Sequence, residues 1–337
     1  MTIVALDVHA ASFTYVTMRA KDQHSRPRKC PMSGTELMRV VNGVPGPKTV
    51  VLEEGPSAQW IKELLSKHVE RVMICNPRTN RLISKAGFMN DERSALTLAE
   101  LQIGNYTEEV VHPDSHGAEL RRVFNQYYRW NKEIVATKSR LKASFRQAGV
   151  QATGSTIYSS SGRKSWRAKL SGEPALLMQA EQYWALLEFL EQSKSQTFKV
   201  CRKLAQQNPA YAMMDSLPGA DQVISTGYVA LIGAASRFAR KNLLWSYFGL
   251  GNGGHKSGSS IDSTQASDQG NRIAKWLVGQ HVRTVLNGRQ PNRFKDQYES
   301  CLRRGLSHGD ACRSVARSLL SVARVLWIKG EKYQETR

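Results

Sequence analysis

The segment Ile3-Val4-Ala5-Leu6-Asp7-Val8 decides the fold of the first part of this 337-residue chain. Its side chains are apolar except for one acid near the end, which is the pattern of a buried β-strand that presents a single carboxylate. The segments that follow alternate between strand and helix patterns. The N-terminal part is therefore predicted to be an α/β domain.

Two further strands are expected directly after the first, at residues 13–18 and 28–32. Ser33 and Glu36 then form a capping-box pattern, which opens a helix. The remaining expected elements are a strand at 48–53, a helix at 57–69, a strand at 71–75 and a last helix at 91–102. Three strands followed by alternating helices and strands is the order of an RNase H-like domain.

Three acids stand at the places where such a domain holds divalent metal, namely the first strand, the end of the fourth strand and the last helix. They are Asp7, Glu53 and Asp91. Carboxylate oxygens suit Mg²⁺, which neutralises phosphate charge and lowers the pKa of a bound hydroxyl. Each acid also has an ordinary explanation, as a strand-end residue, a solvated loop acid or a helix-dipole partner. His9 follows Asp7 on the same face and could touch metal or substrate, or simply pack.

Charge and composition favour a nucleic-acid partner. The chain has 48 Lys and Arg against 28 Asp and Glu, a formal net charge of +20, and these cations are spread over its whole length. No apolar run approaches the length of a spanning helix, and no targeting signature is visible at the N-terminus. The five cysteines show no disulfide or zinc pattern. We expect a cytoplasmic protein that binds DNA and does not associate with membrane.

A glycine-rich stretch over residues 247–262 reads Y-F-G-L-G-N-G-G-H-K-S-G-S-S-I-D. Its backbone can approach another backbone or a phosphate closely. Ser257, Ser259 and Ser260 are candidate nucleophiles, of which Ser257 is preferred, and His255 and Lys256 could hold an anion or take a proton. The alternative is a polar surface loop without chemistry. A serine hydroxyl needs a base or a metal, and the N-terminal acids could supply the metal.

The middle of the chain predicts a long helical hairpin. Apolar residues recur by sevens from Leu120, and a second helix opens near Pro174. The Ser/Gly-rich, basic segment 149–172 between them is expected to be a loop. The hairpin could cover a core or mediate dimerisation.

Cations along the predicted helices leave two interpretations open. On the first hairpin helix they lie among Tyr127, Tyr128 and Trp130, which suits RNA contacts or a basic face around an aromatic seam. Helices expected at 271–286 and 309–328 carry cations that could line a DNA path or face solvent. These cations are Arg272, Lys275, Arg283, Arg313, Arg317 and Arg324.

Short motifs recur in order over nearly the whole chain. They are A-L-D-V-H at 5–9, L-E-E-G-P at 52–56, N-D-E-R-S-A-L-T-L-A at 90–99, L-P-G at 217–219, R-F at 237–238, F-G-L at 248–250, S-G-S-S at 257–260 and G-N at 270–271. Together they resemble the DEDD-type transposases of bacterial insertion sequences, which are bridge-RNA-guided serine recombinases with a RuvC-like domain, and the related pilin-gene DNA invertases.

The resemblance implies three domains. Residues 1–111 would form a RuvC-like metal-binding domain and residues 112–208 a coiled-coil-like helical hairpin. Residues 209–337 would form a mostly helical transposase domain whose nucleophile loop spans 249–262. It also implies a homo-oligomer, dimeric or tetrameric, and a structured noncoding (bridge) RNA that pairs with target DNA.

The same resemblance implies roles for single residues. The metal ligands would be Asp7, Glu53 and Asp91, the metal Mg²⁺ or Mn²⁺, and the attacking hydroxyl that of Ser257. One position departs from the family pattern, because a second Asp is expected three residues after Asp91 and Ser94 stands there instead. A hydroxyl is a weaker Mg²⁺ ligand than a carboxylate, so this fourth metal position is weakened or filled by water.

The main hypothesis is a DNA transposase or recombinase in which metal at the three acids activates Ser257 to attack a phosphodiester. Three alternatives remain. The chain could be a protein-guided site-specific DNA invertase, or a RuvC-like junction nuclease that uses water and leaves Ser257 idle. It could also be a catalytically weakened nucleic-acid-binding relic, as Ser94 suggests. Because the acids and the serine lie in different domains, a site assembled between protomers is expected.

Overall fold

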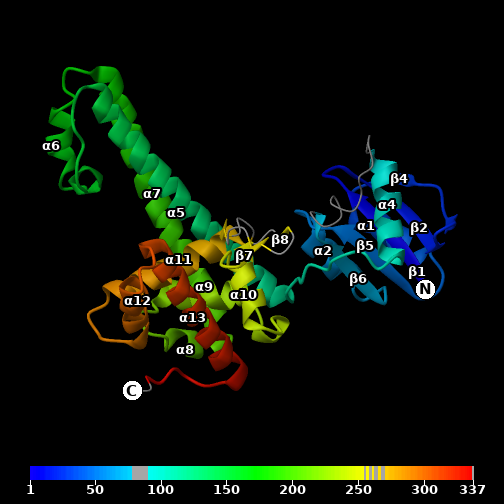
Figure 1. Ribbon diagram of the computed structural model, residues 1–337. Helices are drawn as coiled ribbons and strands as arrows, with labels where there is room; N and C mark the ends of the chain where they lie inside the picture. The colour runs from blue at the N-terminus through cyan, green and yellow to red at the C-terminus, as the bar shows by residue number, and fades with distance from the viewer. Residues whose placement is uncertain (78–89, 254–255, 258–259, 262–264, 267–269, 336–337) are drawn as a thin grey trace. The chain divides into compact units, whose positions relative to one another are not determined.

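The computed structural model describes residues 1–77, 90–253, 256–257, 260–261, 265–266 and 270–335, and between 252 and 269 it describes the backbone alone. The chain divides into two compact units, Met1–Ala118 and Glu119–Arg337. In the described residues the first unit is mixed α/β, and the second is helical apart from short strand pairs (Figure 1). The α/β-plus-α class expected from sequence is confirmed at this level.

One mixed β-sheet organises the first unit. Strand β1 (Thr2–Val8) lies antiparallel to β2 (Ser12–Ala20) and parallel to β5 (Lys48–Glu53), which in turn lies parallel to β6 (Arg71–Cys75). Long apolar runs form these strands, as the sequence predicted.

Two shorter strands extend the sheet beyond β2. They are β3 (Gln23–His24) and β4 (Arg28–Pro31), and both pair antiparallel with β2. The sheet therefore runs β3-β2-β1-β5-β6, with β4 also on β2. Strand β3 was not expected from sequence, because two residues carry no hydrophobic period. The helices of the unit are α1 (Gly34–Asn42), α2 (Ala58–Leu65) and α4 (Asp91–Ile103).

Alternate side chains of β1 enter two different cores, because successive residues of a strand point to opposite faces. Val4 and Leu6 are buried with residues of α1 and α2. Ile3 and Ala5 are buried on the other face, under α4. The alternation puts Asp7 on the α4 face of the sheet.

The second unit contains a long antiparallel hairpin, formed by α5 (Ser115–Gln147) and α7 (Pro174–Gln206). Trp130 Nε1 donates to Thr197 Oγ1 (3.1 Å), and Ser144 Oγ donates to Gln179 Oε1 (2.7 Å), so the two helices run in opposite directions. The residues that recur by sevens on α5 are all buried, as a helix seam requires. They are Leu120, Tyr127, Ile134 and Leu141.

The tip of the hairpin is more structured than the loop expected over 149–172. It contains a 3₁₀ turn, η1 (Thr156–Tyr158), and a short helix, α6 (Arg163–Ala168). Ile157 and Trp166 are buried in the hairpin core, where Trp184 Nε1 donates to the Ile157 carbonyl (2.7 Å). Apolar residues this sparse show no period, so the sequence pattern did not reveal the packing.

A helix that is buried on every side lies at the centre of the second unit. It is α9 (Gln222–Ile232), in which all residues from Ile224 onward are buried, as is typical of a core helix. The helices after α7, besides α9, are α8 (Ala210–Asp215), α10 (Lys241–Tyr247), α11 (Arg272–Asn287), α12 (Arg293–Arg303) and α13 (His308–Lys329). Helices α7, α8 and α11 pack against α9, and the second unit contains further helices beyond these (Figure 1).

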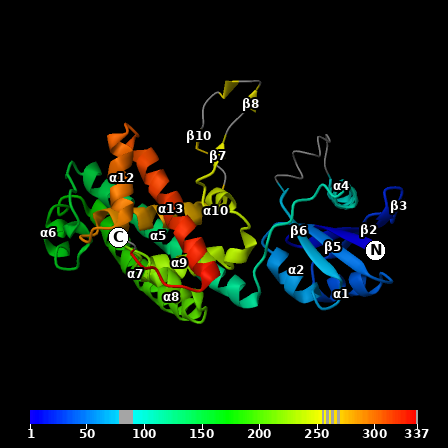
Figure 2. The ribbon, with the colours of Figure 1, turned by 60° about the horizontal axis from the view of Figure 1, so that its bottom comes forward.

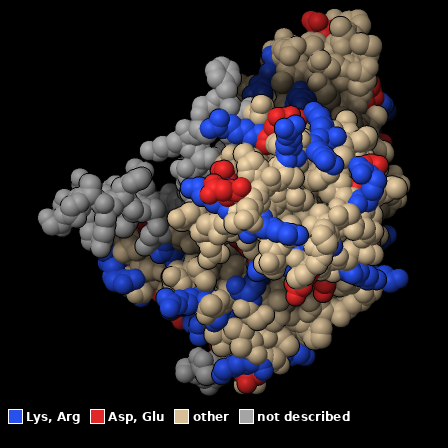
Figure 3. Space-filling view, turned by 90° about the vertical axis from the view of Figure 1, so that its right-hand side faces the viewer, with Lys and Arg blue, Asp and Glu red and all other residues tan. Residues whose placement is uncertain are grey.

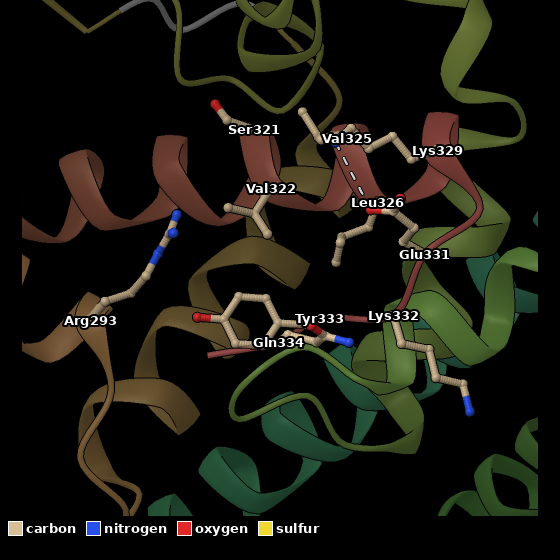
Figure 4. A pocket seen from close by; sticks show the side chains of 10 residues that line it. All are labelled: Arg293, Ser321, Val322, Val325, Leu326, Lys329, Glu331, Lys332, Tyr333 and Gln334. Carbon is tan, nitrogen blue, oxygen red and sulfur yellow. Dashed lines mark ion pairs between the residues drawn. The ribbon is translucent and has the colours of Figure 1, made fainter. Parts of the chain in front are cut away.

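The chain after α13 folds back along the second unit. The Tyr333 amide donates to Ser216 Oγ (2.8 Å), and the Arg293 amide donates to Glu335 Oε1 (2.9 Å). A pocket of about 840 Å³ lies between α13 and this segment, and Figure 4 shows Val322 and Leu326 pointing into it from the helix. Within the described residues, no helix combines the length and apolarity needed to cross a bilayer.

A buried histidine ties α11 to α9 and to the turn before it. His281 Nε2 lies 2.9 Å from the Pro218 carbonyl, which can only accept, so this nitrogen carries the proton. Nδ1 then accepts from the Tyr228 hydroxyl (2.7 Å). Burial lowers the pKa of His281 from 6.5 to about 4, which keeps the ring neutral at neutral pH.

We expect this arrangement to weaken the second unit at acid pH. Because the folded-state pKa of His281 is depressed, its stabilisation is complete above 6.5 and is lost as the pH falls toward 4. At about 1.4 kcal/mol per pKa unit, the loss approaches about 3 kcal/mol. Urea unfolding of the native protein and of His281→Phe should show a stability difference that shrinks between pH 7 and pH 4.5. A difference that stays constant would contradict this role.

Candidate active site

Asp7, His9 and Asp91 converge at one edge of the first unit. Asp7 lies near the end of β1, and Asp91 is the first residue of α4. His9 Nε2 lies 3.2 Å from Asp7 Oδ2 and 3.2 Å from Asp91 Oδ1. One ligand atom from each of the three side chains lies within 4.8 Å of the others, close enough to share a metal ion.

Glu53 and Ser94, the other two predicted ligands, lie at the end of β5 and in the first turn of α4. Leu6 pairs with Leu52 in parallel register, so Glu53 ends the strand next to Asp7. Its charge acts on the Asp7 carboxyl, but among the described residues the 4.8 Å set is limited to the other three. Ser94 lies one turn after Asp91, and its amide donates to the Asn90 carbonyl (2.9 Å).

Lys29 also reaches the cluster, and sequence reasoning missed it. Its Nζ donates to Asp91 Oδ2 (2.8 Å). Asp7 pairs with Thr14 across β1 and β2, and Thr14 pairs with Lys29 across β2 and β4. Residues in one such row project from the same face of a sheet. The pairing register, which the sequence does not state, is what brings Lys29 to the acids.

The two aspartates are in different electrostatic environments. Burial raises the pKa of Asp7, the charges of Asp91 and Glu53 raise it further, and His9 opposes them. The pKa of Asp91 is lowered, mainly by its hydrogen bond from Lys29 and also by His9. Acids that repel each other and attract the cation of Lys29 form a site that favours positive charge. Two carboxylates and an imidazole suit a divalent ion such as Mn²⁺, while the carboxylates also suit Mg²⁺.

Glu54, the neighbour of Glu53, is held by other partners. His112 Nε2 lies 2.5 Å from Glu54 Oε2, and His112 Nδ1 lies 2.7 Å from Gln59 Oε1. Glu54 therefore interacts with His112, after the last helix of the sheet domain, whereas the charge of Glu53 raises the pKa of Asp7.

The segment between Tyr247 and Asn271 contains Ser257 and is called the serine loop here. Its two ends meet at a narrow neck, formed by Tyr247 and Gly249 on one side and by Gly270 and Asn271 on the other. Gly270 has φ +113°, and a Cβ on this residue would lie 2.6 Å from the Gly249 nitrogen, a contact that no side chain could make. The Asn271 amide donates to the Tyr247 carbonyl (2.7 Å), and its side-chain amide donates to the Tyr247 hydroxyl (3.1 Å). These contacts join the two ends of the loop.

Two arginines that were predicted either to line a DNA path or to face solvent instead donate to main-chain carbonyls of the second unit. Arg317 donates to the Leu250 carbonyl from Nε (2.9 Å) and from Nη2 (2.6 Å). Arg324 donates to the carbonyls of Phe238 (2.8 Å) and Ala239 (2.9 Å). Both guanidinium groups therefore use some of their hydrogen-bond donors on the protein's own main chain, and those donors do not bind DNA.

The strands of the serine loop stand away from the helices of the second unit (Figure 2). β7 (Asn252–Gly253) pairs with β10 (Gln265–Ala266), and β8 (Lys256–Ser257) pairs with β9 (Ser260–Ile261). Ser257 lies opposite Ser260 in this hairpin. The Ser257 side chain, and Ser259 and His255 altogether, lie outside what the structure describes.

The aromatic residues on α5 pack inside the protein. Tyr127 is 8% exposed and stacks near Phe198, and Trp130 bonds to α7. Tyr128 makes an edge contact with Trp276 of α11. The structure therefore favours an aromatic seam over a base-stacking surface. On the face shown in Figure 3, Lys and Arg lie scattered, with Asp and Glu among them.

Residues 211–299 match the family model described as "Transposase IS116/IS110/IS902 family". The matched segment begins in α8 and ends in α12, so it includes the serine loop and its neck. No curated protein matches the chain. The family match supports a DNA transposase or recombinase at the general level, with DNA as a partner.

We expect the neck to tolerate no side chain at Gly270. Gly270→Ala would bring Cβ against the Gly249 backbone at a φ that L-residues rarely adopt, at a cost of about 2 kcal/mol or more. Gly279→Ala is a matched control, because a Cβ there meets no atom within 4 Å, and it should stabilise α11 by roughly 1 kcal/mol. Urea unfolding and hydrogen exchange of the Asn271 amide would measure both effects. If Gly270→Ala and Gly279→Ala changed stability and hydrogen exchange equally, Gly270 would not form the close contact that defines the neck.

Proposed function

We propose that this protein is a DNA transposase or recombinase that cleaves and rejoins DNA through Ser257, assisted by a divalent cation held in the first unit. The family match over residues 211–299 carries the proposal, because the matched segment contains the whole serine loop. The cluster of Asp7, His9 and Asp91 supports the metal part.

We also propose that the first unit is an RNase H-like, RuvC-like domain. Its central strand lies between an antiparallel neighbour and a parallel one, and two helices cover one face while α4 covers the other. Asp7, Glu53 and Asp91 then occupy the strand ends and the helix start where such a domain places its acids. His9 would add an imidazole ligand, which compensates in part for Ser94.

The chain's own residues would act as follows. Asp7, Glu53 and Asp91 would hold Mg²⁺ or Mn²⁺, which when bound neutralises phosphate charge and lowers the pKa of a hydroxyl. Lys29, which pairs with Asp91 (2.8 Å), would be released to meet a DNA phosphate. The Lys29 cation would then contact the same phosphate whose charge the metal ion held by the carboxylates would neutralise.

The covalent step exchanges one phosphoester bond for another. The Ser257 oxygen bonds to phosphorus while the bond from phosphorus to one deoxyribose oxygen breaks. The proton leaves Ser257 and ends on that oxygen, which departs as a free hydroxyl. The number of phosphoester bonds is unchanged, so the linkage to Ser257 can be passed to a new strand without an external energy source.

A structured noncoding RNA and a homo-oligomer complete the proposal, and both rest on the resemblance to bridge-RNA-guided recombinases. Exposed cations along α5 support an RNA contact through the phosphate backbone. They are Arg122, Arg129, Lys132, Arg140 and Arg146. A protein purified free of RNA that still inverts or joins specific DNA sites would instead favour a protein-guided invertase.

Ser257→Ala should abolish the covalent protein–DNA adduct. A DNA substrate labelled at one end and resolved on a denaturing gel would show the adduct as a shifted band that protease removes. Ser260→Ala is the matched control, since Ser260 lies opposite Ser257 in the same hairpin. An adduct that survives Ser257→Ala would exclude this nucleophile, and free DNA ends produced at full rate would favour the junction nuclease.

Ser94→Asp should raise the affinity for divalent metal, because it adds a carboxylate one turn after Asp91. Titration of Mn²⁺, followed by electron paramagnetic resonance, would compare it with Ser94→Asn, which has similar size and no charge. The same spectra test His9, whose imidazole nitrogen should produce a ¹⁴N coupling that His9→Gln removes. Unchanged affinity in Ser94→Asp would show that Ser94 is not what limits metal binding.

A further inference from the structure

A groove lies between α11 and α13 of the second unit. Its volume is about 600 Å³, and at one end it reaches Gly249 and Leu250, at the neck of the serine loop. We call it the α11–α13 groove and define it by Lys275, Gly279 and Arg283 of α11 and by Cys312 and Arg313 of α13.

The rim of the groove is cationic. Lys275, Arg283 and Arg313 line it, and no Asp or Glu is found among the described residues that do so. Arg313 bonds to Asp310 (2.8 Å), whereas neither Lys275 nor Arg283 pairs with a carboxylate in the described part of the chain. The pocket beside the C-terminal segment differs, since it includes the acid Glu331 (Figure 4).

The floor of the groove is apolar. Val278, Val282 and Ala316 form it and are at most 5% exposed. Gly279 opens the wall, because a Cβ there would meet no atom within 4 Å. A phosphate alone would use the rim and leave this floor idle, whereas a flat, apolar base or a deoxyribose would fill it.

We propose that the α11–α13 groove binds single-stranded DNA, with phosphates on Lys275, Arg283 and Arg313 and at least one unstacked base on the apolar floor. The bases of duplex DNA are stacked inside the helix, so none could contact the apolar floor unless the duplex opened. A strand seated here would pass the neck and lead toward the serine loop. The inference rests on the proposed function, and it assigns that function a site for the strand next to the reacting phosphate.

Cys312 gives a direct reporter of occupancy. Of the five cysteines, the other four are buried and Cys312 alone is partly exposed. A single-stranded oligodeoxynucleotide of about ten nucleotides should slow alkylation of Cys312 by N-ethylmaleimide several-fold, measured by mass spectrometry of the intact full-length protein. Inorganic phosphate at the same concentration should not. Unprotected Cys312 in a protein saturated with oligonucleotide would overturn the proposal, and stronger protection by RNA of the same sequence would assign the groove to RNA.

Charge and shape variants test the two halves of the site separately. Lys275→Gln with Arg283→Gln should lower the salt dependence of oligonucleotide binding by roughly 1.4 in the logarithmic slope, for two lost phosphate contacts. Arg272→Gln, an exposed cation on the same helix outside the groove, should leave it unchanged. Gly279→Trp should fill the groove and weaken oligonucleotide binding at least several-fold. Gly279→Ala, whose added methyl group is small, should bind the oligonucleotide with nearly the native affinity.

These outcomes are independent of the serine chemistry. Ser257→Ala should keep both the protection of Cys312 and the salt dependence, because binding needs no bond to the serine. If the covalent adduct is never formed and Cys312 is still protected, the groove stands while the proposed reaction fails. If the adduct forms and Gly279→Trp binds as well as the native protein, the reaction stands and the groove is refuted.

Discussion

The parallel register of β1 and β5 is the constraint on which the first unit depends. Main-chain hydrogen bonds set Leu6 beside Leu52, and the next residue on each strand is therefore an acid at the same edge of the sheet. Alternation along β1 sends Ile3 and Ala5 under α4 and carries Asp7 to that same face. Burial of the apolar residues thus fixes an acidic edge that would otherwise repel itself, and Lys29 and His9 offset the repulsion.

In the second unit, arginine side chains donate hydrogen bonds to main-chain carbonyls that water would satisfy at a protein surface. Arg121 donates to the carbonyls of Ala230 (3.4 Å) and Leu231 (3.3 Å), where the buried helix α9 ends, and Arg317 and Arg324 satisfy carbonyls beside the serine loop. A helix that ends inside the protein needs such donors. The formal charge of +20 therefore overstates the charge that is free to meet nucleic acid.

Much of the fold was visible in the sequence because its signals are local. The capped start of α1 and the seven-residue seam of α5 appear where expected, since a cap and a helical period each involve residues close along the chain. The candidate site was only partly visible. Asp7 and Asp91 come together, but Lys29 enters through the pairing of β2 with β4, a long-range register with no local signature. The packed tip of the hairpin was missed for the same reason.

By itself, the sequence determined the long strands and the helices of the first unit, the two hairpin helices, the residues that are chemically able to act, and the basic character of the chain. Tertiary structure decided which of those residues meet. It assigned Arg317 to a carbonyl and left Lys275 and Arg283 on the rim of a groove, although all three are cations on helices of the same unit. The physical reason is that the partner of a long cationic side chain is set by the element packed against its helix, and packing between distant segments is not written in any local pattern.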